Sequence, residues 1–156
     1  MVVDYKSGRG KHFRELVDDP VRQGQTLQLG LYAEAVAQQR GGGEVASWFW
    51  MLNGNGAYKR HGGPWTEAAR TRFLDVLTAI TDGIEAGTFP AVSGEFDPFW
   101  RIHDNCTYCA FDRVCPRDRD EHQQLKAGAP ELAVLARLLP PADAEDAPAT
   151  GQGEAP

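Results

Sequence analysis

The sequence predicts an α/β fold, in which short apolar strands alternate with amphipathic helices. Residues 2–6 are apolar and β-branched at their start, which is typical of a strand. Residues 24–39 repeat apolar side chains at helical spacing, and residues 45–51 are aromatic and apolar enough for a buried strand. At 156 residues, the chain is long enough for one domain with a real core.

The segments around the first helix are punctuated by glycine and proline. Residues 7–23 contain two early glycines and Pro20, so we expect a loop there. The helix at 24–39 repeats an apolar residue every four positions and is predicted to end at the glycines at 41–43. The repeated residues are Leu27, Leu31 and Ala35.

A hairpin and a second helix are expected next. The asparagines and glycines at 53–56 indicate a turn, after which residues 57–60 pair back on the strand at 45–51. Thr66 is a good N-cap for a helix that Gly87 closes. The apolar face of this helix is predicted to comprise Ala69, Phe73, Val76, Leu77, Ile80 and Ile84.

The C-terminal third shows weaker patterns. Residues 88–105 are predicted to be irregular, residues 117–126 helical, and a short helix is expected within 128–139. After the prolines at 140–141, the acidic tail rich in Pro and Ala has too few large apolar residues to order itself, so residues 140–156 are predicted to be disordered.

Composition excludes a membrane protein and leaves a nucleic-acid partner open. No apolar run reaches membrane-spanning length, and the start lacks the features of a signal peptide, so the sequence predicts a cytoplasmic protein. The net charge is −6, but the tail at 140–156 holds four acidic residues and no Lys or Arg. Net charge therefore neither supports nor excludes DNA as a partner.

Four polar residues are the candidate catalytic set. Strand alternation places Asp4 and Lys6 on one face and Tyr5 on the other. Gln28 and Tyr32 are four residues apart, so they share one face of the predicted helix. A carboxylate that binds a divalent metal and an ammonium that offsets charge on the reacting oxygens are the groups that phosphodiester hydrolysis needs. An isolated Asp-x-Lys pair is more often a solvated strand face, and the joint occurrence with Gln28 and Tyr32 favours the catalytic interpretation.

Residues 2–8 (VVDYKSG), followed by residues 27–32 (LQLGLY), resemble the PD-(D/E)XK nuclease superfamily, and within it the RecB-like branch. This branch contains the nuclease domains of AddB-type helicase–nucleases and CRISPR-associated RecB-like exonucleases. The resemblance implies a restriction-endonuclease-like core, a mixed sheet flanked by helices. It also implies Mg²⁺ or Mn²⁺ as cofactor, DNA as substrate and a helicase domain or subunit as partner.

The resemblance assigns a role to each of the four residues. Asp4 is implied to bind Mg²⁺ or Mn²⁺, with the backbone carbonyl of Tyr5 completing the metal shell. Lys6 is implied to position the attacking water or to stabilise the pentavalent phosphate. Gln28 and Tyr32 are implied to orient Lys6 and the DNA backbone.

The sequence departs from the family pattern at its N-terminal end. The family places another metal-binding Asp on a strand before the Asp-x-Lys strand, and RecB-like members add an earlier His. We therefore expect the core to be incomplete at its N-terminus, with an unpaired flank on residues 2–6. The chain alone is expected to show weak nuclease activity or none unless the missing N-terminal half of the nuclease is supplied.

Three cysteines within ten residues indicate a metal rather than disulfides. The resemblance implies that Cys106, Cys109 and Cys115 hold a [4Fe–4S] cluster, together with a fourth cysteine upstream of the core. The alternative is structural Zn²⁺ bound by the same three cysteines and His103, which lies three residues before Cys106. Residues 103–116 would then be a metal-binding clasp at the end of a nuclease segment spanning 1–127.

The sequence thus predicts a metal-dependent exonuclease-type DNA nuclease domain of a recombination and repair helicase–nuclease system. The alternative is a non-catalytic DNA-binding or scaffolding module stabilised by a Cys-ligated metal. The presence of all four candidate catalytic residues favours the nuclease, whereas the missing upstream acid favours the alternative.

Overall fold

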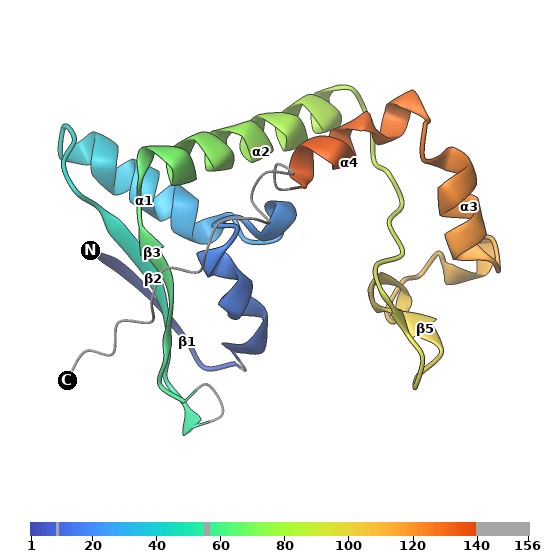
Figure 1. Cartoon of the computed structure of the whole chain (residues 1–156), viewed down its shortest axis with the longest axis horizontal. Coiled ribbons are helices and arrows are strands. Elements are labelled where there is room, and N and C mark those ends of the chain that lie inside the picture. Colours follow the sequence, from blue (N-terminus) through green and yellow to red (C-terminus); the bar gives the residue numbers. More distant parts are fainter. Residues whose placement is uncertain (9, 55–56, 140–156) are drawn as a thin grey trace. The chain divides into compact units, whose positions relative to one another are not determined.

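A computed structural model describes residues 1–8, 10–54 and 57–139 (Figure 1). The chain divides into two compact units, which we describe separately. Unit 1 comprises Met1–Ile80 and Arg137–Pro156, and unit 2 comprises Thr81–Ala136. The predicted disordered tail at 140–156 lies outside the described residues. In the part of the chain that is described, no helix is both long enough and apolar enough to cross a bilayer.

Unit 1 is built on a mixed three-stranded sheet, which confirms the predicted α/β class. The strands are β1 (Val2–Lys6), β2 (Ala46–Met51) and β3 (Arg60–Pro64), in the order β1-β2-β3. β1 runs parallel to β2, and β2 runs antiparallel to β3. Among the described strands β1 therefore lies at an edge of the sheet.

The helix α1 (Gln28–Gln39) connects β1 to β2, and it begins four residues later than predicted. Residues Arg22–Gly24 form the short 3-10 turn η2, in which Gln23 has a φ of 55° and Gly24 a φ of 88°. These left-handed conformations cannot continue into an α-helix. The predicted glycine stop is confirmed, because Gly41 has a φ of 69°.

The predicted helix is confirmed, but the repeat that indicated it does not mark the buried stripe of α1. Leu31 is 50% exposed, whereas Leu29, Gly30 and Ala33 are buried. The four-residue repeat of Leu27, Leu31 and Ala35 therefore follows a stripe beside the packed one. The packed stripe contains a glycine, which a hydrophobicity pattern does not register.

The segment 7–23 is not only a loop, as predicted, but contains the 3-10 helix η1 (Gly10–Val17). The side chains of Phe13 and Leu16 pack with Leu29 of α1 and Phe49 of β2. η1 thus covers the same face of the sheet as α1 (Figure 1). Burial of these two apolar side chains explains why a glycine-containing segment folds onto the sheet.

The predicted hairpin forms, with a different second strand. β3 spans Arg60–Pro64 and begins where the expected strand at 57–60 ends. Ala57 and Tyr58 both have a φ of 52°, so they belong to the turn rather than to a strand. Asn55 and Gly56 of the predicted turn lie outside the described residues.

The helix α2 (Glu67–Glu85) begins and ends as predicted. The Oγ1 atom of Thr66 accepts a hydrogen bond from the backbone N–H of Ala69 at 3.1 Å, and Gly87 has a φ of 68°. Phe73 and Val76 are fully buried, and they pack with Val21 in the second core cluster of unit 1. Ile84, predicted on the buried face, is 56% exposed.

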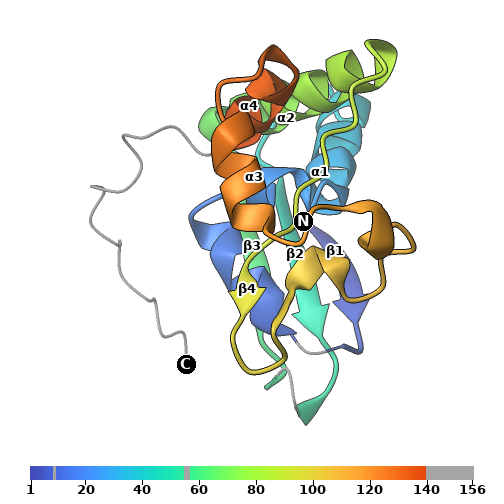
Figure 2. The same ribbon diagram turned by 90° about the vertical axis from the view of Figure 1, so that its right-hand side faces the viewer.

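Unit 2 has little regular structure, as expected for residues 88–105. Two-residue strands β4 (Phe96–Asp97) and β5 (Ile102–His103) pair antiparallel, and the 3-10 turns η4 (Asp104–Cys106) and η5 (Asp112–Val114) follow. The predicted helix at 117–126 is α3 (Arg119–Lys126), capped by Asp118 (Figure 2). The helix expected within 128–139 comprises η6 (Pro130–Leu132) and α4 (Ala133–Leu138), whose last two residues belong to unit 1.

An ion pair connects α1 to α2. Arg70 donates from Nε and Nη2 to the two carboxylate oxygens of Glu34 at 2.9 and 3.0 Å, and the indole of Trp65 donates to the same carboxylate at 3.3 Å. The hydrogen bonds from Arg70 and from Gln38 hold the pKa of Glu34 at about 2, below the ordinary 4.5, although burial opposes the shift. A bidentate pair of this kind fixes the two helices at a defined distance.

The depressed pKa of Glu34 makes stability depend on pH in a defined direction. The unfolded carboxyl titrates near 4.5 and the folded one near 2, so the stabilisation is complete above pH 4.5 and is lost as the pH falls toward 2. We expect Glu34→Gln to destabilise the fold by about 1–3 kcal/mol at pH 7. Urea unfolding between pH 7 and pH 3 should show a flatter pH profile for this variant. Glu44→Gln, at an exposed position, is the control and should keep the wild-type profile.

Candidate active site

Asp4 and Lys6 form an ion pair on the helix-covered face of the sheet. The Nζ atom of Lys6 lies 3.0 Å from Oδ1 of Asp4. Tyr5 points to the opposite face, where its ring centroid lies 6.0 Å from that of Trp50. The alternation predicted for this strand is therefore confirmed.

Gln28, at the first position of α1, joins the ion pair to the helix. Its Oε1 accepts a hydrogen bond from Nζ of Lys6 at 2.8 Å, and its Nε2 donates to Oδ2 of Asp4 at 2.6 Å. The same Nε2 lies 2.9 Å from the hydroxyl of Tyr32, one turn further along α1. The four residues predicted as a catalytic set thus form one connected cluster.

The environment of the cluster strengthens its electrostatics. The side chain of Asp4 is 15% exposed and that of Lys6 is 29% exposed, so both charges are partly removed from water. The Nζ atom of Lys6 also lies 4.7 Å from the centroid of the buried Phe49 ring. Reduced contact with water makes the attraction between these charges larger than at an exposed surface.

The donors around Asp4 fit one divalent ion that keeps most of its water. The carboxylate of Asp4 and the backbone carbonyl of Tyr5 would supply oxygen ligands, which Mg²⁺ prefers, and Mg²⁺ usually takes only one or two carboxylates from the protein. Within the described ranges, no three or more His, Cys, Asp or Glu side chains gather into a group that holds a metal. The residues present therefore do not form an all-protein cage.

A cavity of about 390 Å³ lies elsewhere in unit 1, between η1, β3 and the start of α2. Apolar residues such as Leu16, Leu29 and Trp65 line it, and the Asp19–Arg72 ion pair lies at its wall. None of the four cluster residues lines this cavity. The candidate catalytic residues therefore lie on β1 and at the N-terminus of α1, not in the cavity.

The predicted metal ligands of unit 2 do not converge on one site in the described structure. Cys106, Cys109 and Cys115 are half-buried free thiols within the described residues, and they belong to no metal-holding group there. His103 is buried; its Nδ1 lies 3.2 Å from the carbonyl oxygen of Gly94, and its Nε2 lies 3.8 Å from Asp120. The present arrangement thus directs His103 to these two partners rather than to a shared ion with the cysteines.

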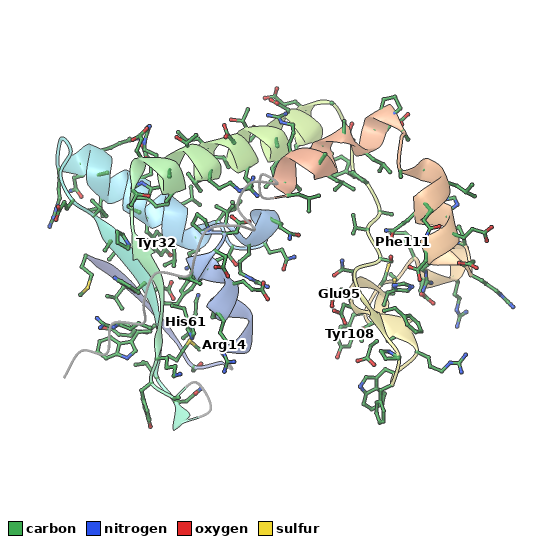
Figure 3. All side chains as sticks on the ribbon, in the orientation of Figure 1. Arg14, Tyr32, His61, Glu95, Tyr108 and Phe111 are labelled. Carbon is green, nitrogen blue, oxygen red and sulfur yellow. The ribbon has the colours of Figure 1, made fainter. Side chains whose placement is uncertain are left out.

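Sequence reasoning missed the side chains next to the cluster. His61 of β3 is paired in register with Phe49, which is itself paired with Asp4, so the three residues share a face of the sheet. Burial lowers the pKa of His61, and the positive charges of Arg14 and Lys59 lower it further. Figure 3 shows Arg14 and His61 next to each other on unit 1, with Tyr32 on α1. The pairing register of the hairpin is what places His61 on the sheet face of Asp4.

Comparison with known proteins gives one match. A family model described as the PD-(D/E)XK nuclease superfamily matches residues 1–116. The matched span contains the four-residue cluster and all three cysteines, and a small mixed sheet with flanking helices is consistent with a restriction-endonuclease-like fold. No curated protein and no solved structure gives a significant match.

The geometry of Gln28 predicts an unusual response to an isosteric substitution. Gln28→Glu replaces the amide nitrogen, 2.6 Å from Oδ2 of Asp4, by a second carboxylate oxygen. Two carboxylates at this distance raise the pKa of one of them, and a raised folded-state pKa gives stability that is lost as the pH rises.

Urea unfolding from about pH 4 to about pH 8 tests this expectation, because an ordinary glutamate titrates near 4.3. We expect the stability of Gln28→Glu to fall over this range relative to Gln28→Met, which removes the same hydrogen bonds without adding a charge. Identical pH profiles for the two variants would show that the amide is not held against Asp4.

Proposed function

Since the chain belongs to the PD-(D/E)XK nuclease superfamily, we propose that it is a metal-dependent nuclease domain of the RecB-like branch, which hydrolyses phosphodiester bonds of DNA from an end. The observation that supports this most directly is the network in which Gln28 holds both Asp4 and Lys6. An amide with both ends engaged orients an acid and an amine toward one place, which is what a phosphoryl-transfer centre needs.

Each residue of the cluster has a role in this proposal. Asp4 and the backbone carbonyl of Tyr5 hold Mg²⁺ or Mn²⁺, which when bound supplies a more acidic water and neutralises charge on the reacting oxygens. Lys6 places its ammonium beside the phosphate and offsets the negative charge that develops there. Gln28 orients Lys6 by accepting a hydrogen bond from its Nζ, and Tyr32 holds the Gln28 amide in place.

A second candidate is a non-catalytic DNA-binding or scaffolding module. It is favoured by the presence of a single carboxylate in the cluster, since no metal-holding group of three or more acidic, His or Cys side chains exists among the described residues. The family pattern has a further acid on a neighbouring strand, and the free edge of β1 is where such a strand would pair. Association with a helicase domain or subunit and action in recombination and repair are part of the first proposal.

Substitution of Lys6 tests the nuclease assignment. We expect Lys6→Ala to reduce the Mg²⁺- or Mn²⁺-dependent cleavage rate by about 10²–10³-fold, because one stabilising group at the reacting oxygens is lost, while DNA binding persists. Asp4→Asn should abolish the metal-dependent cleavage, because the carboxylate that holds the ion is lost. Cleavage of end-labelled single- and double-stranded DNA by the 156-residue chain is the measurement, with low absolute rates expected.

Lys126→Ala is the matched control, since this exposed lysine lies on α3 in unit 2. Full activity of Lys6→Ala would contradict the assignment. DNA binding by the wild-type chain without any metal-dependent cleavage would favour the second candidate instead.

We further propose that Cys106, Cys109 and Cys115 hold a [4Fe–4S] cluster with a fourth ligand, in preference to Zn²⁺ with His103. The supporting facts are the compact spacing and the position of all three cysteines inside the family match. The thiols do not form a metal-holding group in the described structure, so no catalytic step is assigned to this site. Its role would be to tie the segment 103–116 together.

Metal analysis distinguishes the two forms of the cysteine site. Protein purified under nitrogen should contain iron and acid-labile sulfide and show brown visible absorbance, which Cys109→Ser should abolish. Zinc bound to the protein in a one-to-one ratio, and lost in His103→Ala, would show that the site holds zinc instead of iron. Cys109→Ser that retains both colour and iron would contradict the ligand assignment.

A further inference from the structure

A second group of polar side chains shares the sheet face of Asp4. The register pairs Asp4 with Phe49 and Phe49 with His61, so the Cα atoms of Asp4 and His61 are two strand spacings apart. At about 4.8 Å per spacing this is roughly 10 Å. Measured along the axis of a duplex, one strand rises by about three nucleotides over this distance, at about 3.4 Å per nucleotide.

Packed aromatic side chains connect Lys6 to His61. Nζ of Lys6 lies 4.7 Å from the centroid of the Phe49 ring, and the ring of Phe13 lies 4.5 Å from that of Phe49. On its other side, Phe13 lies 6.4 Å from the ring of His61. The packing from Lys6 to His61 is therefore continuous beneath η1, with Phe49 itself buried.

The charge around His61 is positive. Arg14 of η1 and Lys59, two residues before His61, both lie close enough to lower its pKa, after the effect of burial. Figure 3 shows Arg14 next to His61, and Arg14 is exposed to solvent. The lowered pKa favours the neutral imidazole, which carries one N–H that can donate a hydrogen bond.

Three arginines of unit 1 are paired with carboxylates, whereas Arg14 and Lys59, like Arg40 and Arg60, form no ion pair among the described residues. Arg22, Arg70 and Arg72 each lie within 3.3 Å of a carboxylate, those of Glu15, Glu34 and Asp19. Even in a chain of net charge −6, cations that form no ion pair among the described residues can attract an anion.

We propose that Arg14, Lys59 and His61 form a phosphate-binding arm that holds the DNA strand a few nucleotides from the Asp4–Lys6 centre. This inference rests on the proposed nuclease function and extends it by naming side chains that position the substrate. Arg14 and Lys59 contact backbone phosphates, and His61 donates a hydrogen bond to one of them. Such contacts fix the register of the strand without reading its sequence.

The salt dependence of DNA binding tests the arm without relying on cleavage. Fluorescence anisotropy of a labelled single-stranded oligonucleotide in EDTA, over a range of salt concentrations, gives the slope of log K against log salt. Each phosphate contact contributes about 0.7 to this slope for single strands. The double variant Arg14→Ala/Lys59→Ala should therefore lower its magnitude by about 1.4 and weaken binding at low salt.

The double variant Arg40→Ala/Lys126→Ala removes the same charge from exposed positions and is the control. Its slope should stay near that of the wild type. Circular dichroism and urea unfolding of both variants establish that they fold, and Arg14→Lys should restore most of the slope that alanine removes.

The outcomes separate this inference from the nuclease assignment. An unchanged slope in Arg14→Ala/Lys59→Ala, or equal losses in both double variants, would overturn the arm even if the wild-type chain cleaves DNA. A loss of about 1.4 confined to the Arg14/Lys59 variant would support the arm even if no cleavage occurs, in which case the nuclease proposal alone fails. Absence of salt-dependent DNA binding by the wild-type chain would also overturn the arm.

Discussion

The Gln28 amide is the interaction on which the arrangement of the site depends. Its oxygen and nitrogen are both engaged, with Lys6 at 2.8 Å and Asp4 at 2.6 Å, so the amide has one orientation and the first turn of α1 has one position over β1. Packing in the core fixes the same position of α1. A Cβ atom on Gly30, two residues later, would lie 2.4 Å from the ring of Phe73 on α2. The close contact between α1 and α2, fixed further by Glu34 and Arg70, therefore keeps the amide over the ion pair.

Local periodicity explains which parts of the site could be predicted from the sequence. Asp4 and Lys6 share a face because a strand alternates, and Gln28 and Tyr32 share a face because a helix repeats nearly every four residues. The same patterns gave the strands and helices of unit 1 within a few residues. The packed stripe of α1 was missed because Gly30 is buried by its close approach to the Phe73 ring, which a hydrophobicity pattern does not indicate. η1 was missed because its glycine-containing segment is stabilised by Phe13 and Leu16 on Phe49, a contact between distant parts of the chain.

Tertiary contacts explain why the arm was not visible in the sequence. His61 faces Asp4 only through the register of two strand pairs, and the hairpin was expected at 57–60 rather than at Arg60–Pro64. Arg14 reaches His61 only because η1 folds onto the sheet. The net charge of −6 was equally uninformative. At physiological salt, charges interact over only about 8–10 Å, so acidic residues farther away weaken the local charge of Arg14 and Lys59 little.

The Asp4–Lys6 ion pair bears on how the proposed centre would be loaded. Oδ1 of Asp4 is engaged by Lys6 and Oδ2 by Gln28, so a divalent ion held by Asp4 would compete with both for the carboxylate. Lys6 would still be held by Oε1 of Gln28. In the proposed centre, that hydrogen bond would keep the ammonium beside Asp4. The Gln28 amide therefore links Lys6 to α1 independently of the carboxylate, and the lysine would keep this contact whether or not Asp4 holds an ion.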